Sequence, residues 1–280
     1  MWTIPKPNVS AVDCFNTCIG RIRSADLKAR MEAVRGAITA AETAFDQAAA
    51  NTDLHLIEGA ADVGGVVTAK EMTDTYDQRM AKSGSPGRDI YDQLIIAAKG
   101  DLCPFCGHRN VSTLDHCLTK AQHPALAVTP INLVPSCKDC NHEKGAAQLN
   151  GKADQLLNAY YDDIENDLWL HAQVVQGSPP GARFFVIPND NWDAVTVRRV
   201  DNHFYTLKLA KLYASQAGRQ LQNMRGALGE IYDAAGPVAV RDDLLRRHRS
   251  CSQVQVNSWE AALYAATASS DWYCDGGFRA

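Results

Sequence analysis

The sequence predicts a mainly α-helical protein, α+β overall, with a small metal-bound module in its middle. Apolar residues recur at three- and four-residue steps in both flanks, which is typical of amphipathic helices. Between the flanks, two Cys-x-x-Cys pairs bracket a segment in which two strands and a helix can form. We therefore divide the chain into a helical N-terminal region (residues 1–100), the module (101–150) and a mostly helical C-terminal region (151–280) with a short strand pair.

The composition is that of a globular protein, with 280 residues, 46% of them hydrophobic and 21% charged. No apolar run reaches membrane-spanning length, and the first residues lack a signal peptide pattern, so we expect a soluble, cytoplasmic protein with no membrane partner. The net charge of −4 gives no global attraction to nucleic acid. Residues 198–250, however, hold ten Arg and Lys against five acids. Such a segment can bind phosphate locally, and a solvated helix face is an equally open alternative.

Three helices are predicted before the first cysteine pair. They cover residues 10–50, about 68–80 and 88–98, with a glycine-containing loop at 51–67. Ser24 or Asp26 is placed to cap a helix, and Thr68 with Glu71 forms a capping-box pattern. We expect this region to complete the helical core or to bind a partner.

The region after the module is also predicted to be mostly helical. We expect a helix around 153–171, a strand at 183–188 that residues 194–200 can pair with, a long helix over 202–235 and a last helix from Trp259. Pro237 suits the first turn of the next helix. The aromatic C-terminal segment, residues 271–278, is predicted to pack on the core.

Four cysteines of the module have the spacing of a structural metal site: Cys103, Cys106, Cys137 and Cys140. Two residues between cysteines let both thiolates reach one ion from a tight turn, which Pro104 and Gly107 favour. Two such turns supply the four-sulfur set that structural Zn²⁺ prefers. A closed site of this kind leaves no position for a substrate, so we assign it to structure and not to catalysis.

The other cysteines are expected to be structural. Burial is predicted for Cys14, Cys18, Cys251 and Cys274. Cys117 adjoins His116 and could serve as a nucleophile beside an imidazole. Adjacent residues of a strand face opposite ways, however, so we expect Cys117 to point away from His116.

Polar residues between the cysteine pairs form a second candidate site. Residues 111–116 read as a strand and 138–148 as a helix. Asp115 and Asn141 supply oxygen ligands of the kind that Mg²⁺ prefers, and His116 can remove a proton from water. Asn132 is placed to orient the imidazole. The predicted phosphate contacts are Lys144, which lies three residues past Asn141 on a helix, and Lys120.

The motifs Cys-Pro-x-Cys-Gly, Leu-Asp-His and Asn-Leu-Val-Pro-x-Cys-x-x-Cys-Asn-x-x-Lys-Gly resemble the four-cysteine type of HNH endonuclease over residues 101–146. The resemblance implies a ββα-metal fold and metal-dependent hydrolysis of phosphodiester bonds in nucleic acid, with DNA expected over RNA. It implies that His116 is the general base and that Asn132 positions it. It also implies that Asp115 and Asn141 hold a catalytic Mg²⁺ or Mn²⁺, and that the four cysteines hold a structural Zn²⁺.

The sequence departs from the commonest pattern of these nucleases at two positions. Thr119 stands where many relatives have a proline, which puts the rigidity of that loop in question. Asn141 stands where the third letter of the HNH name has histidine, and asparagine is a frequent alternative there.

The flanks resemble bacterial HNH proteins of antiphage defence systems, including the nuclease subunits of Septu-like and retron-linked ATPase–nuclease pairs. That resemblance implies an effector nuclease in defence, with an ATPase or another defence protein as partner. The alternative from a different class is a zinc-stapled module that binds nucleic acid or protein without catalysis. Such a module needs the cysteines but has no use for Asp115, His116 and Asn141.

Overall fold

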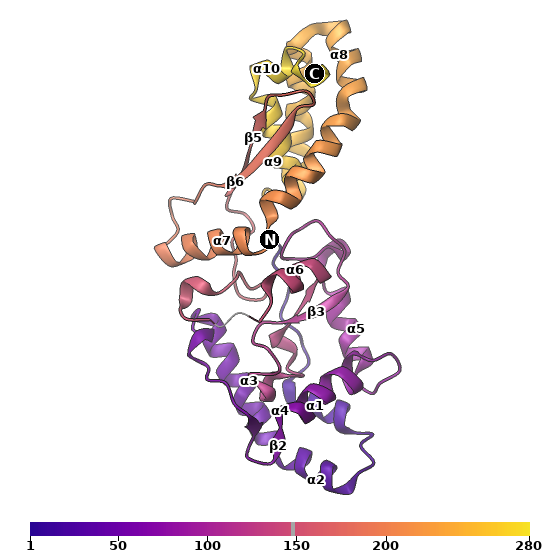
Figure 1. The fold of residues 1–280 in the computed structure, drawn as a ribbon, viewed down its shortest axis with the longest axis vertical. Coiled ribbons are helices and arrows are strands. Elements are labelled where there is room, and N and C mark those ends of the chain that lie inside the picture. Colours follow the sequence, from indigo (N-terminus) through magenta and orange to yellow (C-terminus); the bar gives the residue numbers. More distant parts are fainter. Residues whose placement is uncertain (147–148) are drawn as a thin grey trace. The chain divides into compact units, whose positions relative to one another are not determined.

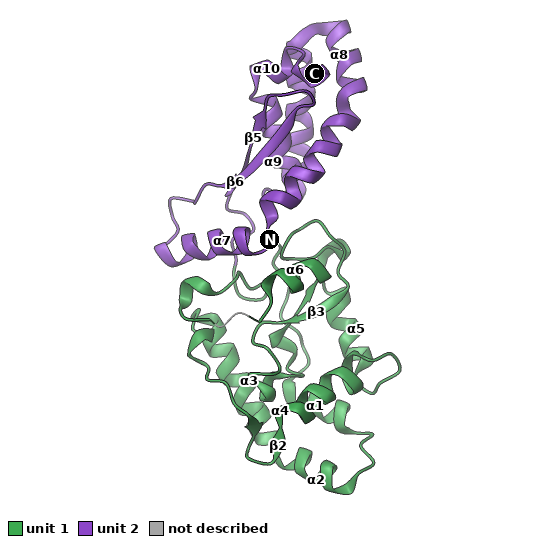
Figure 2. Ribbon diagram, viewed as in Figure 1, with its two compact units in different colours: residues 1–162 green, residues 163–280 purple. Residues whose placement is uncertain are grey.

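The structure, a computed structural model, describes residues 1–146 and 149–280, which fall into two compact units, residues 1–162 and 163–280 (Figure 2). The described chain is mainly helical, with three two-stranded antiparallel sheets (Figure 1). The expectation of a mainly helical α+β protein is therefore confirmed. The N-terminal region and the described part of the 101–150 module lie in the same unit.

The first unit contains short helices and two pairs of antiparallel strands, and the longer pair is called the hairpin here (Figure 1). The helices are α1 (Ala11–Ile19), α2 (Ala25–Ala33), α3 (Arg35–Ala50), α4 (Ala69–Tyr76), α5 (Arg88–Ile96) and α6 (Lys138–Lys144). The strands are β1 (Asp62–Val63), β2 (Val67–Thr68), β3 (Thr113–His116) and β4 (Leu133–Ser136). Short 3-10 turns lie at Leu54–Leu56, Lys99–Asp101, Pro124–Leu126, Pro130–Asn132 and Lys152–Asp154.

Local capping signals explain where these helices begin. The Ser24 side chain accepts a hydrogen bond from the Leu27 amide and starts α2, so the predicted helix over 10–50 is three helices. Thr68 and Glu71 form the predicted capping box of α4. That helix continues as a π-helical turn over Asp77–Ala81.

One apolar core joins the N-terminal helices to the hairpin. Leu114 of β3 and Leu133 of β4 are buried in the same cluster as Phe15, Ile38 and Met72 of α1, α3 and α4. Burying such side chains is the main favourable contribution to folding. The N-terminal region thus completes the core around the hairpin, one of the two roles expected for it.

Residues 153–171 are not a helix, which corrects the prediction. In this segment, main-chain amides donate hydrogen bonds to side-chain oxygens, and these bonds replace the hydrogen bonds of a helix. The Asn158 amide donates to the Asp162 carboxylate at 2.6 Å, and the Tyr160 amide donates to the Asn158 side chain at 3.0 Å. Further along, the Asn257 side chain accepts from the Trp169 amide at 2.8 Å. Asn and Asp compete with helix formation in this way.

The second unit contains β5 (Leu170–Val175), β6 (Gly181–Val186), α7 (Ala194–Thr206), α8 (Leu209–Val254), α9 (Trp259–Ala268), α10 (Asp271–Cys274) and a 3-10 turn at Gly277–Arg279. The predicted strand near 183–188 is β6, but its partner is β5. Residues 194–200 are helical, which corrects the expected pairing. Asp193 caps that helix by accepting from the Thr196 amide at 2.7 Å.

The long helix α8 is bent where the sequence changes from glycine to proline. Gly236 has a φ of 75° inside the helix, and Pro237 begins the helical segment that follows, as predicted. The aromatic C-terminal segment packs on the core, with Tyr273 and Phe278 buried. No helix in the described part of the chain is at once long and apolar enough to cross a lipid bilayer.

Candidate functional site: a four-cysteine cluster beside a polar pocket

Four buried cysteine sulfurs lie within 4.8 Å of one another, as the spacing predicts: those of Cys103, Cys106, Cys137 and Cys140. The first pair lies in a turn closed by the bridge between Leu102 and Asn110. The second pair opens α6, where Cys137 is the capping residue. A tetrahedral zinc site holds its sulfurs about 3.8 Å apart, from Zn–S bonds of about 2.3 Å, so small shifts fit this cluster to the ion.

The backbone around the first pair forms the turn that such a site requires. Gly107 has a φ of 60°, which favours glycine, and its amide donates to the Cys103 carbonyl at 2.7 Å. The Arg109 amide donates to the Cys106 sulfur at 3.4 Å. A hydrogen bond with the Cys103 thiol lowers the pKa of Cys106 to about 7. The thiolate is the form in which cysteine binds a metal ion.

The hairpin brings the two cysteine pairs together. The strands β3 and β4 pair antiparallel, with Thr113 opposite Ser136, and the Ser112 amide donates to the Ser136 carbonyl at 2.9 Å. Residues that are thirty or more positions apart in the chain thus become neighbours. The four cysteines can hold a metal ion, and their donor set suits zinc.

Asp115 is buried on β3 and is paired with Lys144 from α6. The carboxylate is 3% exposed, and the Lys144 Nζ lies 2.8 Å from Oδ2 and 3.1 Å from Oδ1. The ammonium also donates to the His116 main-chain carbonyl. Burial raises the pKa of Asp115 above its ordinary value, although the Lys144 charge acts in the opposite direction.

His116 follows on the same strand, and its ring is held from two sides. Its Nε2 lies 2.9 Å from the Ala127 carbonyl oxygen, and the ring packs edge-on against Tyr76 at 4.5 Å between centroids. A carbonyl only accepts, so Nε2 carries the proton and Nδ1 keeps a lone pair. Burial lowers the pKa of His116 to about 3, so the imidazole is neutral at physiological pH.

Asn132 is fully buried but does not contact the imidazole, contrary to its expected hydrogen bond with the ring. Its side chain accepts from the Leu118 amide at 2.8 Å and donates to the carbonyls of Leu118 and Leu126 at 2.9 and 3.1 Å. It therefore fixes the loop that carries Ala127. The ring of His116 is oriented through that loop.

Replacing Asn132 with alanine is expected to lower the free energy of unfolding by about 2–4 kcal/mol. The substitution leaves the amide and the carbonyl of Leu118 buried without their side-chain partner, and a buried unpaired polar group is costly. Urea denaturation would measure the change. The matched control is Asn51→Ala, at an exposed asparagine with one side-chain hydrogen bond, where we expect a change of about 0.5 kcal/mol or less. Equal stability of the two variants would contradict the role given to Asn132.

The loop after the hairpin strand is held without the proline of the commoner pattern. The Thr119 carbonyl accepts from the amides of Gln122 and His123 at 3.1 and 2.8 Å. The Thr119 hydroxyl also contacts the Gln122 side chain at 3.1 Å. These bonds form a closed turn, so Thr119 supports the loop by hydrogen bonding in place of a rigid ring.

One cavity of about 460 Å³ joins the remaining predicted residues. Asp115, His116 and Asn141 line it, and so does Lys120. Asn141 lies on α6, one turn before Lys144, so the helix that begins at the zinc-type cluster also delivers residues to this cavity. The four-cysteine cluster and this cavity therefore both include residues of α6 or its cap.

Two residues of the N-terminal region form a wall of the same cavity and were not foreseen from the sequence. They are Tyr76, at the end of α4, and Asp77, which begins the π-helical turn. Asp77 forms an ion pair with Lys120, whose ammonium also lies 4.4 Å from the centre of the Tyr76 ring. The contact joins residues more than forty positions apart, so no local pattern could have signalled it.

The remaining cysteines and histidines lie outside this cavity. Cys117 packs with Phe45 and Leu126, and its sulfur accepts from the Asn158 side chain at 3.4 Å, so it faces away from His116 as expected. Burial raises the pKa of Cys117 to about 12, which leaves it protonated. None of the described lining residues is His108, His123 or His142.

The basic segment of the second unit is partly exposed. Lys211 and Arg219 lie on the outer face of α8 and Arg198 is exposed on α7, whereas Arg199 is buried. Between Asn202 and Gly229 the sequence contains no acid. This face is therefore a local concentration of positive charge on an acidic protein.

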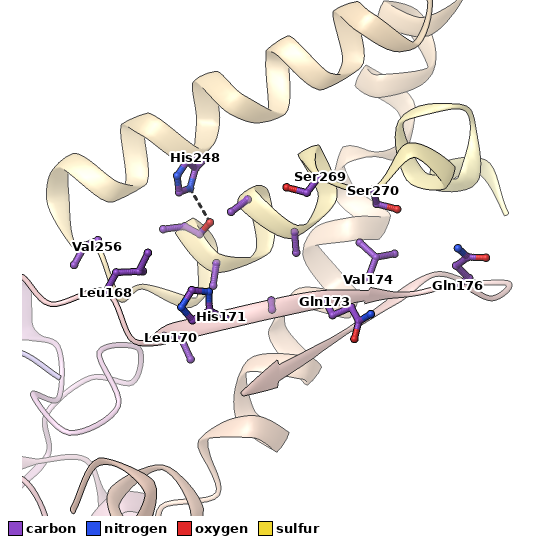
Figure 3. Close-up of a pocket in the computed structure, with 15 residues that line it drawn as sticks. Leu168, Leu170, His171, Gln173, Val174, Gln176, His248, Val256, Ser269 and Ser270 are labelled. Atoms are coloured by element: carbon purple, nitrogen blue, oxygen red, sulfur yellow. Dashed lines mark hydrogen bonds between the residues drawn. The ribbon is translucent and has the colours of Figure 1, made fainter. Parts of the chain in front are cut away.

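A second cavity, of about 470 Å³, lies within the second unit between β5 and α9 (Figure 3). Its walls are mostly small or apolar, with alanines of α9 and His171, Val174 and Gln176 of β5 and the turn after it. The His248 Nδ1 at its side is hydrogen-bonded to the Ala261 carbonyl at 3.0 Å. No described residue that lines it belongs to the predicted sites.

Protein ea31 of Escherichia phage lambda is similar to this chain, with 34% identity over 174 residues. The similar segment makes up 61% of this chain and 58% of the phage protein, so the chain covers less than two thirds of that relative. No protein-family model matches the chain. No solved structure matches it either.

Proposed function

We propose that the module of residues 101–150 is an HNH-type nuclease of ββα-metal fold that hydrolyses phosphodiester bonds, with DNA as the expected substrate. The observation that carries the proposal is the single cavity lined by Asp115, His116 and Asn141 beside the four-cysteine cluster. A hairpin followed by a helix presents these residues together, in the order strand, strand, helix. The helix ends at Lys144, before the predicted end at 148, and residues 147–148 lie outside the described residues.

His116 is the proposed general base. Its Nε2 proton is committed to the Ala127 carbonyl, which leaves the Nδ1 lone pair to take a proton from water. The lowered pKa keeps the ring unprotonated at neutral pH, so the Nδ1 lone pair is not occupied by a proton. Tyr76 packs against one side of the ring and limits its rotation.

Asp115 and Asn141 would hold the catalytic Mg²⁺ or Mn²⁺. Their side chains offer carboxylate and amide oxygens, the donors that such hard cations prefer, and both line one cavity with room for water and phosphate. A bound ion supplies charge stabilisation for the scissile phosphate and the leaving 3′ oxygen. Lys120 lies at the same cavity and is the proposed contact to a phosphate of the substrate.

The four-cysteine cluster is the proposed structural zinc site. It anchors the start of α6 to the turn before β3, and α6 carries Asn141 and Lys144. The exposed Lys211 and Arg219 of α8 supply positive charge that suits a duplex backbone. The antiphage-defence role, with a partner ATPase, stays a prediction from resemblance.

A cleavage assay with Mg²⁺, Mn²⁺ or EDTA tests the proposal against the zinc-stapled binding module. We expect the full chain to nick supercoiled plasmid with either ion, to stop in EDTA and to resume when Mg²⁺ is added back, with zinc content unchanged throughout. Linear duplex, single strands and RNA are compared in parallel. A chain that shifts DNA on a gel and leaves all substrates uncut with both ions would contradict the nuclease and favour the binding module.

A further inference from the structure

Lys144 was expected to clamp a phosphate, but its ammonium is paired with the Asp115 carboxylate. Three oxygens contact it, namely Oδ1 and Oδ2 of Asp115 and the His116 carbonyl oxygen. Two of its three N–H donors form hydrogen bonds, to Oδ1 of Asp115 and to the His116 carbonyl, and Oδ2 of Asp115 lies 2.8 Å away in the same ion pair. The side chain is only 17% exposed, so water does not compete strongly for it.

The same contact occupies the proposed metal ligand. Both carboxylate oxygens of Asp115 lie close to the Lys144 charge, at 2.8 and 3.1 Å, and Asp115 lines the same cavity as Asn141. A divalent ion on those oxygens would meet a unit positive charge a few ångströms away, and like charges at that range repel strongly in a buried site. Lys144 and the ion therefore compete for Asp115.

We propose that Lys144 and the divalent ion exchange at Asp115, and that the exchange frees the Lys144 ammonium to bind the phosphate of the substrate. The inference rests on the proposed function. Without the ion, Lys144 neutralises a buried carboxylate. With the ion, Asp115 changes partner and the ammonium needs a new anion, which the nucleic acid supplies. Metal binding thus precedes and promotes tight contact with the phosphate.

The first test is Mn²⁺ binding to the full chain, measured by calorimetry at pH 8 without nucleic acid. Lys144→Met removes the competing charge, so we expect Mn²⁺ to bind about tenfold or more tightly than in the wild type. The matched control is Lys152→Met, because Lys152 pairs with Asp53 at 3.1 Å in the same unit but does not contact Asp115. That variant is expected to bind Mn²⁺ like the wild type. Zinc content near one per chain verifies that each variant is folded.

The second test is binding of a DNA duplex in a His116→Ala background, which prevents cutting. Lys144→Met is expected to weaken duplex binding with Mn²⁺ present and to leave it unchanged in EDTA, because only the ion-bound state frees the ammonium. Unchanged or weaker Mn²⁺ binding by Lys144→Met, with a wild-type site that Asp115→Asn abolishes, would overturn the exchange alone. Failure of the wild type to bind Mn²⁺ would overturn the proposed metal site, and the exchange with it.

Discussion

Replacing Cys137 with serine is expected to remove the bound zinc and to destabilise the first unit severely. Cys137 is buried, contributes one of four sulfurs and caps α6, so its loss weakens the metal site and the start of the helix together. Metal binding and folding are coupled in small zinc modules, where the ion contributes about 10–16 kcal/mol in zinc-finger peptides. A loss of only about 5 kcal/mol would lower Tm by about 10–20 °C for a domain of this size.

Zinc analysis and thermal unfolding together measure this effect. The matched control is Cys251→Ser, since Cys251 is half-buried on α8 and lies outside the cluster. We expect the control to keep one zinc per chain and nearly the wild-type Tm. A Cys137→Ser protein with full zinc content and wild-type Tm would show that Cys137 is not a ligand.

Replacing His116 with alanine is expected to reduce Mg²⁺- or Mn²⁺-dependent nicking by about 10²–10⁴-fold, the usual contribution of a general base. The imidazole is neutral, its Nε2 is held by Ala127, and it lines the cavity with Asp115. Removing the ring leaves water without a base while the metal ligands remain. Zinc content should stay near one per chain, because the cysteine cluster does not include His116.

The control for this variant is His142→Ala. His142 is exposed on α6, next to Asn141 in sequence, and is not among the described residues that line the cavity. It should cleave like the wild type. Activity of His116→Ala within a few-fold of the wild type would assign the base to another group, and an equal loss in both variants would point to a general effect on α6.

The positions of short, locally coded elements could be predicted from the sequence. The Thr68–Glu71 capping box, the start of a helical segment at Pro237 and the pairing of two Cys-x-x-Cys turns all have the expected structure. Each depends on residues a few positions apart, or on a metal chemistry that fixes partners by type. Local hydrogen bonding and ligand preference are sufficient for such predictions.

One wrong prediction falls where a distant side chain decides the backbone, and the other where a neighbouring helix cap does. Residues 153–171 have helical spacing, but Asn257, about ninety positions later, binds the backbone at Trp169 and Leu170. Residues 194–200 have a composition typical of strands. Asp193, directly before them, accepts a hydrogen bond from the Thr196 amide and begins a helix. Propensity is a weak signal that such contacts override.

The sequence by itself determined which chemical groups the central module contains: four thiols at ligand spacing, a neighbouring carboxyl and imidazole, and amides that follow them. Only the tertiary structure decided how those groups are paired. In the folded chain, Asn132 hydrogen-bonds a loop and not the imidazole, and Lys144 forms an ion pair with Asp115. Tyr76 and Asp77, from the N-terminal region, line the cavity. The reason is physical, because a buried polar group must find a partner, and packing of distant segments determines which partner is within reach.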